Sequence, residues 1–165
     1  MKKGYLLRLS GASAVTAGGF FLLVGISFIL TLFIGEKALV ASGFLLVLGT
    51  LFELFGLIGF FTCQVDSLPR MGLTGFILMV AGIMIDLFPP TGRVLFTIGV
   101  LLFALANQKT KILPSWGFWT WLIGSSAVLI SAFIGGNLLT GLGALVNAGA
   151  LIWLGTALRK QNRVT

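Results

Sequence analysis

The sequence contains no histidine and a single cysteine, Cys63. Without histidine the chain cannot hold a haem or a metal ion through imidazole, and it cannot use imidazole as a general base. A lone cysteine cannot form an intramolecular disulfide or a thiolate metal cluster. We therefore predict neither a metal centre nor a redox cofactor.

Charged residues are also scarce. They make up 9% of the 165 residues, with four acidic and eleven basic side chains, whereas a soluble domain carries about 25%. Hydrophobic residues make up 58% of the chain, and the mean hydropathy is +1.11. So few polar side chains cannot cover a surface that faces water, so lipid must surround most of the chain. The composition predicts an all-α, polytopic integral membrane helix bundle, formed by a single domain over residues 1–165.

Charged residues and turn residues divide the chain into six expected transmembrane helices. Residues 9–35 carry no charge and would form a helix of about 40 Å, enough to cross a hydrocarbon core of about 30 Å. Residues 112–158 also lack charge, but a single helix of that length would reach about 70 Å, so we place a turn at Gly135-Gly136-Asn137. The predicted spans are residues 11–34, 38–62, 71–88, 92–107, 116–134 and 137–158.

The basic residues are unevenly distributed between the two ends of these spans. One end holds both termini and nine of the eleven basic residues: Lys2, Lys3, Arg8, Arg70, Lys109, Lys111, Arg159, Lys160 and Arg163. The other end holds Lys37 and Arg93. Because basic residues favour the cytoplasmic side, we expect an inner (plasma) membrane protein with both termini in the cytoplasm.

Tryptophans and net charge agree with this orientation. Trp116, Trp119, Trp121 and Trp153 fall near the predicted cytoplasmic interface, where indole rings prefer to lie. The net charge of +7 should attract anionic lipid headgroups at that face. We expect no nucleic-acid partner, because no basic patch alternates with stacking aromatic residues.

Small residues recur at spacings of three and four residues, which place them on one face of a helix. In the third span this face holds Gly72, Gly75, Met79, Gly82 and Asp86. In the second span it holds Gly49, Glu53 and Gly56, and in the sixth Thr140, Ala144, Asn147 and Ala150. Such stripes let helix backbones approach closely in lipid. They predict packing seams within the bundle, and a substrate path lined by the glycines is the alternative.

Short segments of the spans also resemble one another. Residues 19–24, 43–47 and 75–80 each begin with Gly-Phe, and residues 99–103 resemble residues 149–153. If the similarity reflects a duplication, two halves of three spans would have opposite topology, an arrangement that many transporters use. Three successive helical hairpins are the alternative interpretation.

Glu53 is the acidic residue predicted deepest in the membrane. Insertion scales assign a cost of about 2.5 to 3.5 kcal/mol to a related acid, aspartate, at the helix centre. Because every lysine and arginine is predicted at a span end, Glu53 should be protonated and hydrogen-bonded or should face a wet cavity. Asn147, in the middle of the sixth span, and Thr50, one turn before Glu53, are its candidate partners. Glu53 would then be either a neutral strut between two spans or a carboxylate that handles protons or cations.

Asp86 is predicted near the outer end of the third span. Arg93 begins the fourth span beyond the turn at Pro89-Pro90. We expect these two side chains to form an ion pair across the turn at the membrane interface.

No catalytic motif occurs among these residues. The sequence lacks HExxH, GxSxG and paired mid-membrane aspartates, so we predict that the protein is not an enzyme. The short chain, without a soluble domain, favours a non-catalytic subunit, scaffold or assembly factor of a membrane complex. The alternative is a small proton- or cation-coupled transporter or channel that uses Glu53 and Asn147. Both functions imply a homo- or hetero-oligomer, since six short helices hardly enclose a pathway alone.

Overall fold

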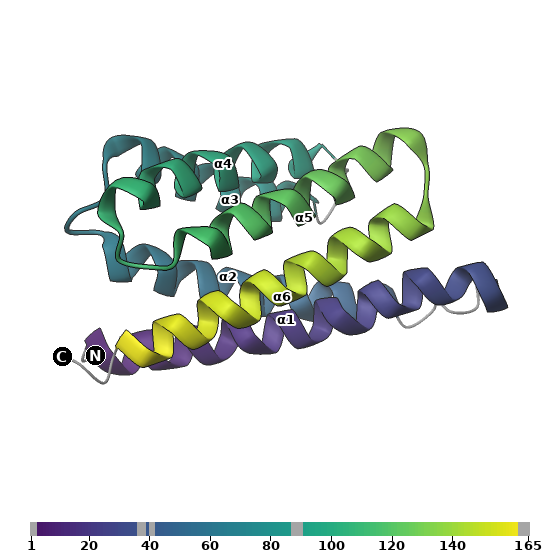
Figure 1. Cartoon of the computed structure of the whole chain (residues 1–165), viewed down its shortest axis with the longest axis horizontal. Helices are drawn as coiled ribbons and strands as arrows, with labels where there is room; N and C mark the ends of the chain where they lie inside the picture. The colour runs from purple at the N-terminus through teal and green to yellow at the C-terminus, as the bar shows by residue number, and fades with distance from the viewer. Residues whose placement is uncertain (1–2, 36–38, 40–41, 87–90, 162–165) are drawn as a thin grey trace.

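The computed structural model describes residues 3–35, 39, 42–86 and 91–161 (Figure 1). Within these residues the chain forms six helices and no strand, which confirms the predicted all-α bundle. The helices are α1 (Lys3–Ile34), α2 (Ser42–Gln64), α3 (Arg70–Asp86), α4 (Gly92–Thr110), α5 (Ser115–Ile134) and α6 (Asn137–Gln161).

The helices end where the sequence places turn residues. Gly35 and Gly135 follow α1 and α5 with φ angles of 72° and 66°, a conformation that glycine adopts without a steric penalty. The Pro69 carbonyl accepts a bond from the Gly72 N–H at 2.8 Å in the first turn of α3. The largest difference from the prediction is the start of α1, which begins at Lys3 rather than near residue 11. The added turns are held because Leu7 and Ser10 are buried in the bundle.

Four of the described helices, α1, α2, α5 and α6, are long and apolar enough to cross a membrane. α3 is shorter, with 17 residues or about 26 Å, and α4 carries Arg93 in its first turn and Lys109 in its last. The chain is therefore a helical membrane protein. That α3 and α4 also cross the bilayer stays a prediction.

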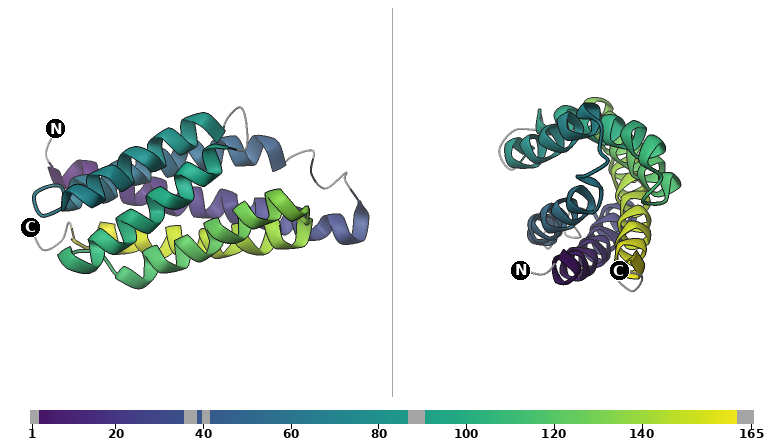
Figure 2. Two further views of the ribbon diagram at one scale, coloured as in Figure 1. Left: turned by 90° about the horizontal axis from the view of Figure 1, so that it is seen from above. Right: turned by 90° about the vertical axis from the view of Figure 1, so that its left-hand side faces the viewer.

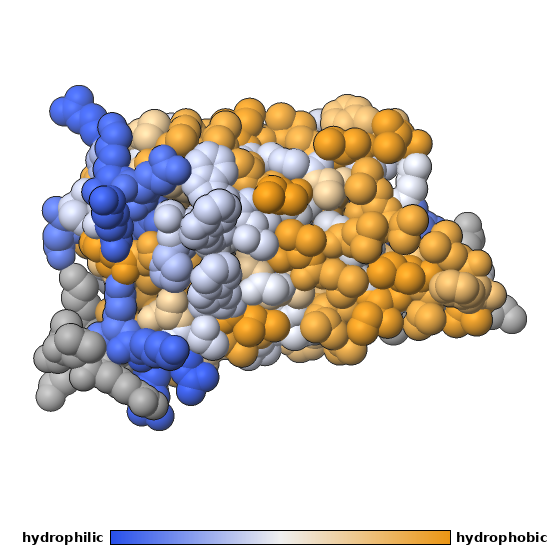
Figure 3. Space-filling model, viewed as in Figure 1, coloured by the Kyte–Doolittle hydropathy of each residue, from blue (hydrophilic) through white to orange (hydrophobic). Residues whose placement is uncertain are grey.

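We call the end of the bundle where α1 begins and α6 ends the basic end. It holds the described residues Arg8, Arg70, Lys109, Lys111, Arg159 and Lys160. Figure 3 shows that hydrophilic side chains gather at this end, whereas apolar side chains cover most of the remaining surface in that view. The charges and the apolar belt are thus separated along the bundle axis, as in a protein that sits in a bilayer.

The helices pack in an open arc rather than around a central axis. α1 packs along α2 and α6, α6 along α5, α5 along α4, and α4 along α3. α2 and α3, at the two ends of this series, make few contacts with each other. Figure 2 shows the arc in its end-on view. The loosely packed side of α2 therefore faces the concave side of the arc.

Glycines form the seam between α3 and α4. A Cβ atom on Gly75 would lie 2.8 Å from the Gly99 carbonyl oxygen, and one on Gly82 would lie 2.7 Å from the Gly92 carbonyl oxygen. A Cβ on Gly72 would lie 2.8 Å from the Cβ of Ala106. The predicted face of α3 therefore packs backbone to backbone against α4.

A second seam joins α1 to α6, and the sequence analysis did not identify it. A Cβ on Gly18 would lie 2.8 Å from the Ala148 carbonyl oxygen, and one on Gly25 would lie 2.8 Å from that of Gly141. Gly11 and Gly155 approach each other in the same way. The signal was available in the sequence, because Gly11, Gly18 and Gly25 recur every seven residues.

An aromatic cluster fills the bundle between its centre and the basic end. Phe60 of α2 contacts Phe118 and Trp121 of α5 edge to face, with ring centroids 5.9 and 6.1 Å apart. Phe103 of α4 lies 5.3 Å from Phe118. These four side chains are fully buried. The Trp121 ring therefore packs against neighbouring helices and does not reach lipid, whereas Trp116, near the start of the same helix, is exposed. That these tryptophans lie at the depth of the membrane interface stays a prediction.

Candidate functional site

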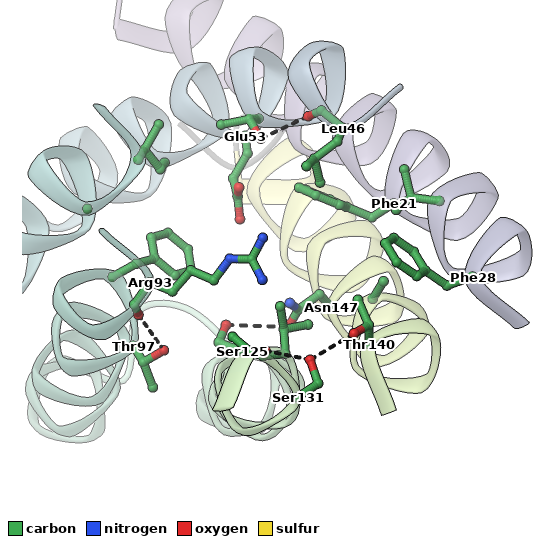
Figure 4. A pocket seen from close by; sticks show the side chains of 18 of the residues that line it. Phe21, Phe28, Leu46, Glu53, Arg93, Thr97, Ser125, Ser131, Thr140 and Asn147 are labelled. Atoms are coloured by element: carbon green, nitrogen blue, oxygen red, sulfur yellow. Dashed lines mark hydrogen bonds between the residues drawn. The ribbon is translucent and has the colours of Figure 1, made fainter. Parts of the chain in front are cut away.

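A cavity of about 620 Å³ lies within the bundle, and residues from each helix, α1 to α6, line it (Figure 4). Its polar lining residues are Thr50, Glu53, Arg93, Thr97, Ser125, Ser131, Asn137, Thr140 and Asn147. Its apolar walls include Phe21, Val24, Phe28, Leu46, Val47, Ile83, Phe96, Val128 and Ala144. The lining extends to Gly135 and Gly136, in the turn between α5 and α6. The cavity therefore runs from the middle of the bundle toward the end opposite the basic end.

Glu53 lies midway along α2, and its side chain points into the cavity (Figure 4). Only 5% of the residue is exposed. Gly49 and Gly56, on the same helix face, bring α2 close to α1: a Cβ on Gly56 would lie 2.9 Å from the Cβ of Ala14, and one on Gly49 would lie 3.2 Å from the Cβ of Phe20. The two glycines thus fix the helix on either side of the carboxyl group.

Arg93 lines the same cavity from the first turn of α4. Figure 4 shows its guanidinium group extending toward the Glu53 carboxyl group. We expected no basic residue at the depth of Glu53, but the Arg93 side chain reaches into the cavity that Glu53 lines. The tight Gly82–Gly92 contact between α3 and α4 sets the first turn of α4 beside the cavity, and the long arginine side chain covers the remaining distance.

The predicted pair of Arg93 with Asp86 stays a prediction. Asp86 is the last residue of α3, and its side chain lies outside the described part of the structure. Arg93 itself is placed in the cavity rather than at the outer surface of the turn.

Asn147 of α6 and Ser125 of α5 form the opposite wall. The Ser125 hydroxyl donates a hydrogen bond to Asn147 Oδ1 at 3.5 Å. Gly124 makes room for this amide, since a Cβ there would lie 2.2 Å from Asn147 Oδ1. The structure thus places Asn147 in the same cavity as Glu53, with the guanidinium of Arg93 extending into the space that they line.

Hydroxyl groups complete the polar lining. Thr50, the other partner proposed for Glu53, donates its hydroxyl proton to the Leu46 carbonyl oxygen at 2.8 Å. Thr97 donates in the same way to the Arg93 carbonyl oxygen at 2.8 Å. Thr140 donates to the Ser131 hydroxyl at 2.8 Å. The oxygen of a hydroxyl group that donates a hydrogen bond keeps lone pairs that can accept other hydrogen bonds.

A polar cluster near the basic end was also missed by the sequence analysis. The Thr110 hydroxyl donates to Gln64 Oε1 at 2.9 Å, and Asn107 Nδ2 donates to the Leu113 carbonyl oxygen at 3.0 Å. Cys63 Sγ donates to Gln161 Oε1 at 2.6 Å. These bonds connect α2, α4 and α6 between the aromatic cluster and the basic end. The polar cluster and the aromatic cluster therefore both lie between the cavity and the basic end.

Among the described residues no group of three His, Cys, Asp or Glu side chains could hold a metal ion. The cavity lining instead offers one carboxyl group, one guanidinium group, amides and hydroxyls. No family model, curated protein or solved structure matches this chain.

Proposed function

We propose that this membrane protein is a small transporter that binds an organic solute in its central cavity. The observation that carries the proposal is the cavity itself: residues of one chain line a cavity of about 620 Å³, with a glutamate and an arginine facing each other inside. This volume lies within the range of about 300 to 1,000 Å³ that is typical of small-molecule sites. Binding sites of transporters commonly lie between helices in the middle of the membrane.

The charges favour this function over a scaffold. Burying a carboxylate and a guanidinium costs free energy, and intramembrane ionisable residues usually mark a substrate or ion path. A scaffold, the function that composition favoured first, needs only the outer faces of the helices. Within the described residues, side chains from all six helices of one chain line the cavity, and whether copies of the chain associate stays a prediction.

The orientation belongs to the same proposal. With the basic end in the cytoplasm, as the positive-inside rule favours, the cavity extends toward the outer face of an inner (plasma) membrane. The aromatic and polar clusters then lie on the cytoplasmic side of the solute. They are the contacts that must loosen for release to the cytoplasm.

Cysteine accessibility tests this function without knowledge of the solute. Ser125→Cys, in a Cys63→Ser background, puts a thiol in the cavity wall. We expect a membrane-impermeant thiol reagent to modify it from either face of membrane vesicles, because a transporter exposes its site to both sides in turn. Ile123→Cys is the matched control: Ile123 lies on the same helix but is 63% exposed on the apolar outer surface, so it should react from neither face.

The contrary result is equally clear. If the thiol of Ser125→Cys is as unreactive as that of Ile123→Cys from both faces, water does not reach the cavity. The chain would then fit the scaffold role, with the cavity as a closed part of its core.

A further inference from the structure

We propose that the occupant of the cavity is a zwitterion with an apolar body, a molecule with an ammonium group and an anionic group of the amino-acid type. This inference rests on the proposed function and names its substrate class. The ammonium group would bind Glu53, and the anionic group would bind Arg93. The apolar part would lie against the phenylalanine-rich walls.

Charge balance favours a zwitterion. Glu53 and Arg93 carry opposite charges and face each other across the cavity. A simple cation that binds Glu53 would place a like charge before Arg93, and a simple anion would do the same to Glu53. A zwitterion instead meets each protein charge with the opposite one, which keeps every buried charge paired.

Neutral polar groups line the cavity beside this pair. The Asn147 amide offers both a donor and an acceptor, and it lies opposite Glu53 with its oxygen already bonded by Ser125. Thr50 and Thr97 also line the cavity, and each donates a hydrogen bond to a helix carbonyl, so their oxygens keep lone pairs that can accept hydrogen bonds. Acceptors of this kind suit the several N–H groups of an ammonium, which a single carboxylate cannot satisfy alone.

The cavity also has extensive apolar walls. Phe21, Phe28 and Phe96 line it together with Val24, Leu46 and Ile83, and this lining continues beyond the charged pair. Such walls would leave a wholly polar solute without partners on one side. They fit an aliphatic or aromatic side chain, and phenylalanine rings also attract cations through their faces.

The test is binding to the purified wild-type protein in mild detergent, measured by calorimetry and by the shift in melting temperature. The probes are L-phenylalanine, its methyl ester, which carries only the positive charge, and N-acetyl-phenylalanine, which carries only the negative one. We expect the zwitterion to bind at least about tenfold more tightly than either derivative, since each lost charge removes a charged hydrogen bond. This comparison needs no variant, so it does not depend on whether a mutant folds.

The same chemistry could come from a lipid, and a second pair of probes separates the sources. Lysophosphatidylethanolamine carries an ammonium and a phosphate, whereas lysophosphatidylglycerol carries the phosphate without the ammonium. Preference for phenylalanine over its derivatives identifies a free solute. Preference for the ethanolamine lipid over the glycerol lipid, without phenylalanine binding, identifies a zwitterionic headgroup. Either preference supports the inference.

Variants test which charge of the solute binds Glu53 and which binds Arg93. Arg93→Gln should weaken phenylalanine binding and remove its advantage over the methyl ester, and Glu53→Gln should remove its advantage over the N-acetyl form. Arg70→Gln is the control, because Arg70 is an exposed residue at the start of α3, away from the cavity lining. It should bind phenylalanine like the wild type.

Two outcomes would overturn the inference. One is equal binding of the three phenylalanine probes, and the other is no binding of any zwitterion. If the thiol of Ser125→Cys is still reached from both faces, the transport proposal survives and only the substrate class is wrong. If that thiol is unreachable as well, both proposals fail.

Discussion

Glu53 and Arg93 bring opposite charges into the interior of a chain that has few charges of either sign. A lone charge buried in a membrane protein is costly, and an opposite charge nearby offsets part of that cost. Each side chain therefore lowers the free-energy cost of burying the other. The free energy of unfolding should depend on the two together rather than on each alone.

A double-mutant cycle tests this coupling. Glu53→Leu and Arg93→Leu should each lower the free energy of unfolding, because each leaves the other charge without its opposite. The double variant should lose less than the sum of the two, by roughly 1 to 3 kcal/mol. Reversible unfolding in mixed micelles measures all four proteins. Additive losses, within about 0.5 kcal/mol, would show that the charges act independently.

The sequence could predict one half of this site but not the other. Glu53 and Asn147 were identified because polar residues stand out inside apolar spans. Arg93 was assigned to the membrane interface because it begins a helix, and its position along the chain does not show that a long side chain reaches inward. Ser125 and Thr97 carry no signal, since hydroxyl residues occur throughout the spans.

Glycine seams join α1 to α6 and α3 to α4, where glycines closely approach the backbone of the neighbouring helix. In both seams small residues recur every seven positions and face carbonyl oxygens of an antiparallel neighbour. Such close approach is the main source of helix association in lipid, where hydrophobic burial no longer favours contact between helices. A seam of this kind positions the helices that carry Arg93 and Asn147.

Two neighbouring glycines of α1 allow a matched test of the seam. Gly18 faces α6, where a Cβ would lie 2.6 Å from Ile152 Cγ1, whereas nothing lies within 4 Å of a Cβ on Gly19. Gly18→Ala should therefore lower the stability by about 1 to 3 kcal/mol through overpacking. Gly19→Ala should leave it unchanged or raise it slightly, because alanine favours a helix.

Thermal unfolding in detergent measures both variants. Equal melting temperatures for Gly18→Ala and Gly19→Ala would contradict the α1–α6 seam.

The spacing of three and four residues in the sequence predicted the α3 seam. The α1 seam, whose glycines also recur every seven residues, was not predicted.

The whole molecule is an arc of helices whose two ends, α2 and α3, barely touch. Charges and turn residues predicted most of the helix boundaries, apart from the start of α1, because both are local properties of the sequence. The order of the helices around the arc depends on which faces fit one another, and single spans do not encode it. The cavity arises from this order, so its volume and lining could not be predicted from the sequence.

The packing of the helices also bears on the hypothesis that the chain contains two duplicated halves. If α1 to α3 and α4 to α6 are related halves, the α1–α6 seam corresponds to the α4–α3 seam. Both are glycine seams between antiparallel helices. The loose α2–α3 contact then corresponds to the close α5–α6 contact. Two related halves in different packing states would suit a protein that exposes its site to each side in turn.

Uptake of labelled phenylalanine into proteoliposomes tests the central claim most directly. The account predicts saturable uptake above that of protein-free liposomes, lost in Arg93→Gln and retained in Arg70→Gln. Loss only in the cavity variant would tie the flux to the charged pair rather than to leakage through the bilayer. Uptake no greater than that of protein-free liposomes, from a preparation that binds phenylalanine, would contradict the claim that this chain transports the solute that its cavity holds.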